Sequence, residues 1–89
     1  MKDSLSTRYI AYKRMLSLMD RRSASGRPVP FDVTFVRRKD GAVESYSGCW
    51  LTSRHSSGGT VNVMCPGAHA PKKIRLCLIL TFNNLKVYR

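Results

Sequence analysis

The sequence predicts a mainly β fold of the α+β class, in which an N-terminal amphipathic helix precedes a small antiparallel barrel of about five strands, SH3-like or OB-like. Three observations predict it. Apolar side chains recur every three or four residues near the N-terminus. From residue 31 onward they recur at every second residue, and turn-forming residues separate the alternating segments. The chain has 89 residues, of which 43% are hydrophobic, so we expect one domain. Its parts are a helical segment (1–22), a linker (23–30) and the barrel (31–89).

The helix is expected over residues 4–22. Its apolar stripe has the helical spacing of three and four residues and consists of Leu5, Tyr9, Tyr12, Leu16 and Met19. Candidate caps at its start are Asp3, Ser4 and Ser6. Arg21 and Arg22 in its last turn suit the negative end of the helix dipole. Gly26, Pro28 and Pro30 then prevent the helix from continuing, which defines the linker.

Apolar residues at every second position predict the strands. Residues 31–36 and 42–52 are predicted to form a hairpin around Asp40-Gly41, with Gly48 as a bulge or bend in the second strand. Residues 60–65 are predicted to form the next strand. A long strand is expected over 72–82, with one face of Ile74, Leu76, Leu78 and Leu80 and another of Cys77 and Ile79. Asn83-Asn84 makes a tight turn before the last antiparallel strand, because Asn tolerates positive φ.

The charge indicates a polyanionic partner. Sixteen Lys and Arg stand against five Asp and Glu, a net charge of +11, which exceeds the roughly 2–8 that keeps a small domain in solution. Such a field attracts the phosphate backbone of DNA or RNA, or an acidic protein. The sequence has no apolar segment of membrane-spanning length and no signal-peptide core, so we expect a cytoplasmic protein with no membrane partner.

The residues do not favour a cofactor or a small-molecule substrate. The available zinc ligands are Cys49, His55, Cys65, His69 and Cys77, and only Cys65 and His69 have the close spacing of a zinc-binding pair. Cys65 and Cys77 are expected in strands, as small apolar residues. The acids are scattered, and neither a nucleophile motif nor a phosphate-binding loop occurs. We therefore expect a protein that is not an enzyme and binds neither cofactor nor metal.

Sequence-tolerant nucleic-acid binding is the leading functional prediction, because it needs cations for phosphates and flat side chains for bases. "YSGCW" places Tyr46 and Trp50 on one strand face if the alternation is unbroken, although either side chain also suits the core. Tyr88 is a further aromatic expected at the surface. The predicted nucleic-acid-binding residues are Lys13, Arg14, Arg21, Arg22, Arg37, Arg38, Lys39, Arg54, Lys72, Lys73, Arg75, Tyr46 and Trp50. The alternative is a protein-interaction module that docks an acidic partner on this basic face or on an exposed strand edge.

The segments "FDVTFVRRKDGAVESYSGC" and "RLCLILTFNNLKVY" resemble small uncharacterised proteins of Bacteroidetes phages and mobile elements, some of which have an SH3-like β-barrel. The resemblance covers residues 31–89. It implies a barrel and an accessory role in a mobile element, and it carries over no functional residue.

The segment "SRHSSGGTVNVMCPGAH" resembles the histidine-then-strand segment of HicA-type toxins, small basic ribonucleases with a double-stranded-RNA-binding-domain fold. That resemblance implies a catalytic base at His55, with Thr60 to Met64 on the following strand, and a final helix. The C-terminal segment "LCLILTFNNLKVYR" departs from it, because its alternation predicts strands.

Overall fold

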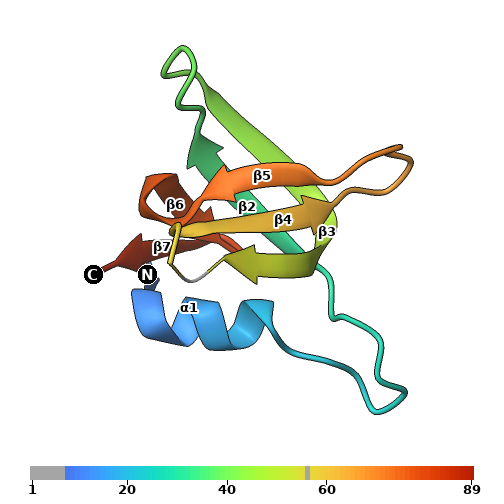
Figure 1. Cartoon of the computed structure of the whole chain (residues 1–89). Coiled ribbons are helices and arrows are strands. Elements are labelled where there is room, and N and C mark those ends of the chain that lie inside the picture. Colours follow the sequence, from blue (N-terminus) through green and yellow to red (C-terminus); the bar gives the residue numbers. More distant parts are fainter. Residues whose placement is uncertain (1–7, 56) are drawn as a thin grey trace.

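The computed structural model describes residues 8–55 and 57–89, which fold into one layer of bent sheet with a short helix against it (Figure 1). The chain order is β1 (Tyr9–Ala11), α1 (Tyr12–Met19), β2 (Phe31–Val36), β3 (Val43–His55), β4 (Thr60–Met64), β5 (Lys72–Arg75), the 3-10 turn η1 (Leu76–Leu78), β6 (Ile79–Phe82) and β7 (Leu85–Tyr88). The predicted mainly β fold with one α-helix is confirmed.

The sheet differs from the predicted barrel in strand number and closure. Its seven strands lie in the order β1-β7-β6-β2-β3-β4-β5. Within the described part of the chain no pairing joins β5 to β1, so the sheet is open rather than closed. The pairings are antiparallel except for β1 with β7, which is parallel. The 13-residue β3 pairs with β2 through its first part and with β4 through its second, and so joins the two halves of the sheet.

The N-terminal segment is only partly helical. Residues 9–11 form β1, where buried Ile10 pairs with Val87, so tertiary pairing with β7 replaces the first predicted turns. The helix covers Tyr12–Met19 and buries Met15 and Met19. It ends at the C-cap Asp20, so Arg21 and Arg22 follow the helix instead of occupying its last turn. Leu5 and the candidate caps Asp3, Ser4 and Ser6 lie outside the described residues.

No helix in residues 8–55 and 57–89 is long and apolar enough to cross a bilayer. After α1 the chain makes a loop that folds back on itself. Val29 donates its backbone N–H to the carbonyl of Arg21 at 3.0 Å, and Ser23 donates to the carbonyl of Arg27 at 2.8 Å. The turn at its tip uses Gly26 at φ +84°, a conformation that a residue with a Cβ adopts only at a cost.

The bulge predicted at Gly48 is confirmed. The register of β2 and β3 shifts between the Phe31↔Cys49 and Val33↔Tyr46 pairs, so β3 carries one extra residue there. Gly48 has φ +65°, and its N–H donates to the Asp32 carboxylate at 2.9 Å. This bulge changes which residues of β3 face the core: Tyr46 before it, and Cys49 and Leu51 after it.

The predicted long strand over 72–82 is wrong, because η1 interrupts it. Residues three apart stack in a 3-10 turn, so Leu76 and Ile79 are both buried, while Cys77 and Leu80 are exposed. The backbone N–H of Leu76 donates to the carbonyl of Gly59 at 2.9 Å, which holds the turn against the β3–β4 loop. The chain thereby passes from the edge strand β5 to β6, which pairs with β2 on the other half of the sheet.

The tight turn at Asn83-Asn84 is confirmed, since φ is +51° and +66° at these two residues. Residues 79–82 and 85–88 form β6 and β7 rather than the helix that the HicA-type resemblance implies for this segment. The core brings together side chains of α1 and of both halves of the bent sheet. It consists of Ile10, Met15, Met19, Phe31, Val33, Phe35, Cys49, Leu51, Val61, Val63, Ile74, Leu76, Ile79 and Phe82.

Candidate nucleic-acid interface

Two cationic segments that are distant in the sequence meet at one hollow. Residues 37–39 lie at the tip of the β2–β3 hairpin, and Lys73 and Arg75 lie on β5. All five side chains line a hollow of about 220 Å³ whose other walls are mainly apolar: Phe35, Val36, Ile74 and Leu78. The fold therefore brings together predicted cations from two distant segments of the chain.

A second hollow adjoins the first. It measures about 350 Å³ and is lined by His55, Ser57, Gly58 and Thr60 together with Lys73 and Arg75, which line both hollows. The strand register explains the grouping, because Thr60 is the partner of both His55 and Arg75, so the three side chains share one sheet face. We call the combined area the cationic surface; it comprises Arg37, Arg38, Lys39, His55, Lys73 and Arg75.

Strand alternation sets the direction of the β5 cations. Ile74 is 1% exposed and enters the core, so its neighbours Lys73 and Arg75 point outward. Lys72 lies on the Ile74 side of the strand and lines neither hollow, although it is exposed. β5 is also an edge strand, where Lys and Arg discourage pairing with a second chain.

The acids near the hairpin compensate one of these cations. Arg37 donates to both carboxylate oxygens of Asp40 at 3.0 and 2.8 Å, and one of its nitrogens lies 3.7 Å from Glu44. The hydrogen bonds to Arg37 hold the pKa of Asp40 below its ordinary value, and the same pairing raises the pKa of Arg37. Within residues 8–55 and 57–89, no carboxylate lies within 4.0 Å of the charged groups of Arg38, Lys39, Lys73 or Arg75. These four are the available phosphate ligands.

The proposed stacking pair of Tyr46 and Trp50 is not formed. The Gly48 bulge breaks the alternation, so Tyr46 faces the core and Trp50 the opposite side of β3. Tyr46 is half-buried, and its ring packs edge-on against Phe35 with centroids 5.1 Å apart. Burial raises its pKa. Trp50 is half-buried opposite Met64, on the face that also carries Lys73.

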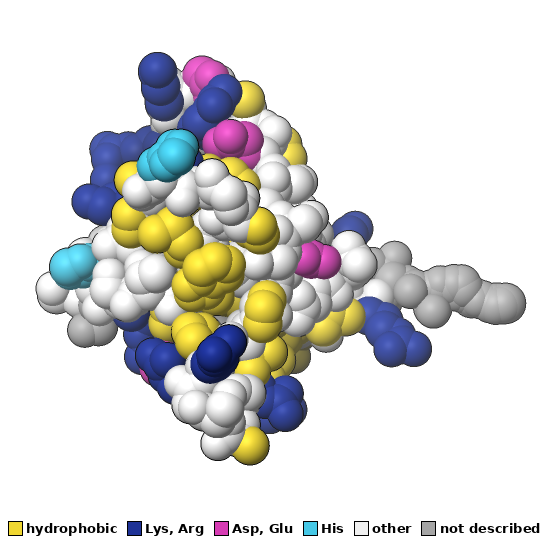
Figure 2. Space-filling view, turned by 90° about the vertical axis from the view of Figure 1, so that its right-hand side faces the viewer, with side chains coloured by type: hydrophobic (Ala, Val, Ile, Leu, Met, Phe, Trp, Pro, Cys, Tyr) yellow, Lys and Arg dark blue, Asp and Glu magenta, His cyan; other side chains and the backbone are white. Residues whose placement is uncertain are grey.

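The other predicted cations lie apart from the cationic surface. Lys13 and Arg14 are exposed on α1, and Arg21 and Arg22 are exposed in the loop that follows, at the end of the molecule opposite the hairpin tip (Figure 1). Figure 2 shows Lys and Arg side chains gathered at the top, around the hairpin, and a separate group at the bottom. Arg54 pairs with Val61 and so points away from the His55 face. The structure therefore places the predicted cations in separate parts of the molecule and gathers residues 37–39, Lys73 and Arg75 at one hollow.

The cysteines and histidines do not assemble. Cys49 is fully buried, its thiol donates to the carbonyl of Phe31 at 3.4 Å, and burial raises its pKa to about 12. Cys65 follows β4 and Cys77 lies in η1, so their predicted strand positions are wrong. Among the described residues, no three His, Cys, Asp or Glu side chains come close enough to hold a metal ion.

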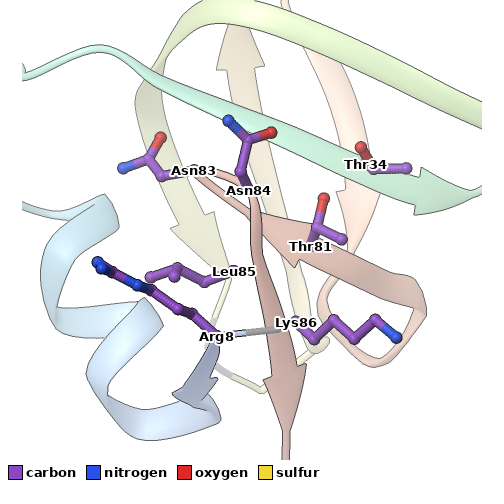
Figure 3. A pocket seen from close by; sticks show the side chains of 7 residues that line it. All are labelled: Arg8, Thr34, Thr81, Asn83, Asn84, Leu85 and Lys86. Atoms are coloured by element: carbon purple, nitrogen blue, oxygen red, sulfur yellow. The ribbon is translucent and has the colours of Figure 1, made fainter. Parts of the chain in front are cut away.

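A third hollow, of about 640 Å³, surrounds the β6–β7 turn (Figure 3). Its cations, Arg8 and Lys86, were absent from the predicted set, because each is isolated in the sequence and only the β1–β7 pairing brings them together. Lys86 donates its backbone N–H to the carbonyl of Arg8 at 3.0 Å. Figure 3 shows the side chains diverging: Lys86 and Thr81 point to one side of β7, and Arg8 and Leu85 to the other. They do not converge on one ligand position.

Comparisons of the chain with protein-family models, with curated proteins and with solved structures gave no match. The resemblances to phage SH3-like proteins and to HicA-type toxins therefore stay predictions.

Proposed function

We propose that the protein binds nucleic acid without sequence preference, through contacts between the phosphate backbone and the cationic surface. The observation that carries this proposal is the shared hollow, where Arg38 and Lys39 of the hairpin stand beside Lys73 and Arg75 of β5 without carboxylate partners among the described residues. The net charge of +11 supplies a long-range attraction for the same ligand.

The geometry suits phosphates better than base edges. Four flexible cations project from a strand edge and a hairpin tip, and each neutralised phosphate releases counterions, which drives binding at low salt. The other polar side chains of the second hollow, His55, Ser57 and Thr60, offer hydrogen bonds to phosphate oxygens or sugar hydroxyls. Such contacts position the nucleic acid on the protein but do not distinguish one base sequence from another.

Charge reversal tests the assignment. Lys73→Glu combined with Arg75→Glu should weaken binding of a labelled DNA duplex at least about tenfold and reduce the slope of log K against log salt by about 0.9 for each lost phosphate contact. The matched control is Arg21→Glu combined with Arg27→Glu, which makes the same change in net charge on exposed residues of the loop after α1. Equal losses in both variants would show that only net charge matters and would contradict a localised interface.

Titrations with heparin and RNA test two other functions. The edge strand β5 also suits an extended acidic peptide, and equally tight binding of heparin, DNA and RNA to the wild-type protein would support such a partner instead. We expect bound RNA to stay intact. Cleavage that His55→Ala abolishes without loss of binding would instead support a ribonuclease with His55 as base.

A further inference from the structure

Two tyrosines are exposed side by side on the outward face of β1 and β7. Tyr9 is 61% exposed and Tyr88 is 53% exposed, and their rings meet edge to face with centroids 6.4 Å apart. In the β1–β7 register, Tyr9 pairs with Lys86 and Ala11 with Tyr88, so all four share one face. Neither tyrosine belongs to the core cluster or packs against it. This pair is therefore available to a ligand.

An apolar hollow adjoins Tyr88. It has a volume of about 270 Å³ and is lined by Ala11, Tyr12, Lys13, Tyr88 and Arg89. Arg89 fixes one wall, because its guanidinium lies over the Tyr12 ring, 4.9 Å from the centroid, and donates to the carbonyl of Leu76 at 2.7 Å. The hollow thus has a preformed aromatic wall beside a half-exposed aromatic ring.

The charge around this face is positive. Lys13 lines the hollow and is exposed, and Lys86 lies on the same face as the tyrosine pair. Among residues 8–55 and 57–89, no acidic residue lines this hollow or the one around the β6–β7 turn. Flat aromatic rings flanked by cations complement a ligand that has flat faces and repeated negative charges, which describes an unpaired nucleic-acid strand.

We propose that Tyr9, Tyr88 and the adjoining hollow form a base-stacking site for single-stranded nucleic acid, with Lys13 and Lys86 contacting its phosphates. The proposal rests on the proposed function and deepens it by naming the strand state of the ligand. Bases in a duplex are already stacked on each other, so only a single strand presents free faces to the tyrosines. The cationic surface, by contrast, accepts phosphates of either form.

The test uses anisotropy titrations of a labelled oligodeoxythymidylate and of a mixed-sequence duplex. Tyr88→Ala should weaken oligodeoxythymidylate binding about 5- to 150-fold, the effect of one lost base stack, and leave duplex binding unchanged. Tyr88→Phe keeps the ring and should retain affinity. Tyr9→Ala, at the more exposed ring, is the second variant and should also weaken oligodeoxythymidylate binding.

The outcomes separate this site from the proposed function. If wild-type protein binds neither oligonucleotide, both proposals are overturned. If it binds both, and the two Ala variants lose nothing or lose equal affinity for strand and duplex, the stacking site alone is overturned. A dimer that dissociates in Tyr9→Ala and Tyr88→Ala, with strand affinity intact, would also overturn it and assign the tyrosines to contact with a second copy of the chain.

Discussion

The guanidinium of Arg37 is held by the carboxylate of Asp40 through two hydrogen bonds of 3.0 and 2.8 Å, within the hairpin that carries Arg38 and Lys39. The same carboxylate accepts the backbone N–H of Ala42 at 3.1 Å. One cation of the cationic surface is thus used to order the turn, which leaves its neighbours to contact a ligand.

Removal of this carboxylate should strengthen nucleic-acid binding. Asp40→Asn removes the carboxylate that holds Arg37 through two hydrogen bonds and leaves only Glu44, at 3.7 Å, so the guanidinium can turn to a phosphate. Loss of an exposed ion pair of this kind corresponds to an affinity gain of up to about fivefold. The slope of log K against log salt for a duplex should steepen by about 0.9. Asp20→Asn is the matched control, because it makes the same charge change at the C-terminal end of α1. An equal gain in that control would assign the effect to net charge.

Substitution of Gly48 tests the bulge that aims the β3 side chains. Gly48→Ala should destabilise the protein by about 1–2 kcal/mol, because φ is +65° and a Cβ is strained in that region. Crowding contributes little to this loss of stability, since the nearest atom to the added methyl group would be Pro66 Cγ at 3.9 Å. Urea denaturation of Gly48→Ala and of Gly58→Ala, whose φ is not positive, measures the difference. Equal stability of the two variants would contradict a backbone origin.

The buried thiol of Cys49 should make stability fall in alkaline solution. Burial raises its pKa from 9.0 to about 12, so the folded state favours the protonated thiol. This contribution is complete below the unfolded pKa and is lost as the pH rises from about 9 toward about 12.

Urea denaturation at about pH 8 and about pH 10 should show a smaller loss of stability for Cys49→Ala than for wild type. The comparison is between pH-dependent losses, because removal of the buried sulfur also lowers stability at every pH. The raised pKa of Tyr46 acts in the same direction in both proteins, and its largest cause, burial, does not depend on the Cys49 thiol. A loss of equal size in the two proteins would contradict the assignment to Cys49.

The sequence correctly predicted the elements that depend only on the preferences of neighbouring residues. The alternation of 31–36, the Asn83-Asn84 turn and the glycine at the bulge each depend on the conformations that nearby residues prefer, and each is present. The prediction for segment 4–22 was partly wrong, because Tyr9 fits the helical stripe and only pairing with β7 makes residues 9–11 a strand, which buries Ile10 and exposes Tyr9. The prediction of one strand over 72–82 was wrong for a similar reason. The backbone hydrogen bond from Leu76 to Gly59 that accompanies η1 joins residues that are distant in the sequence.

The class of ligand could be predicted from the sequence, but the set of residues that forms the site could not. Net charge indicated a polyanion, and Arg38, Lys39, Lys73 and Arg75 of the predicted set do meet. Sequence could not separate them from Lys13, Arg14, Arg21 and Arg22, because all eight are exposed basic residues and only topology places them at different ends of the molecule. Tyr46 and Trp50 do not share a face because the bulge at Gly48 lies between them and reverses the facing of the residues that follow it, up to the next register shift after Leu51.

The most direct test of the central claim is a fluorescence-anisotropy titration of the wild-type protein with labelled single-stranded DNA, duplex DNA and RNA, at low and near-physiological salt, with heparin as competitor. We predict micromolar or tighter binding to nucleic acid that weakens steeply with salt, and a preference among the nucleic acids that heparin does not reproduce. No binding near physiological salt, or equal binding to every polyanion, would contradict nucleic-acid binding and favour an acidic protein partner.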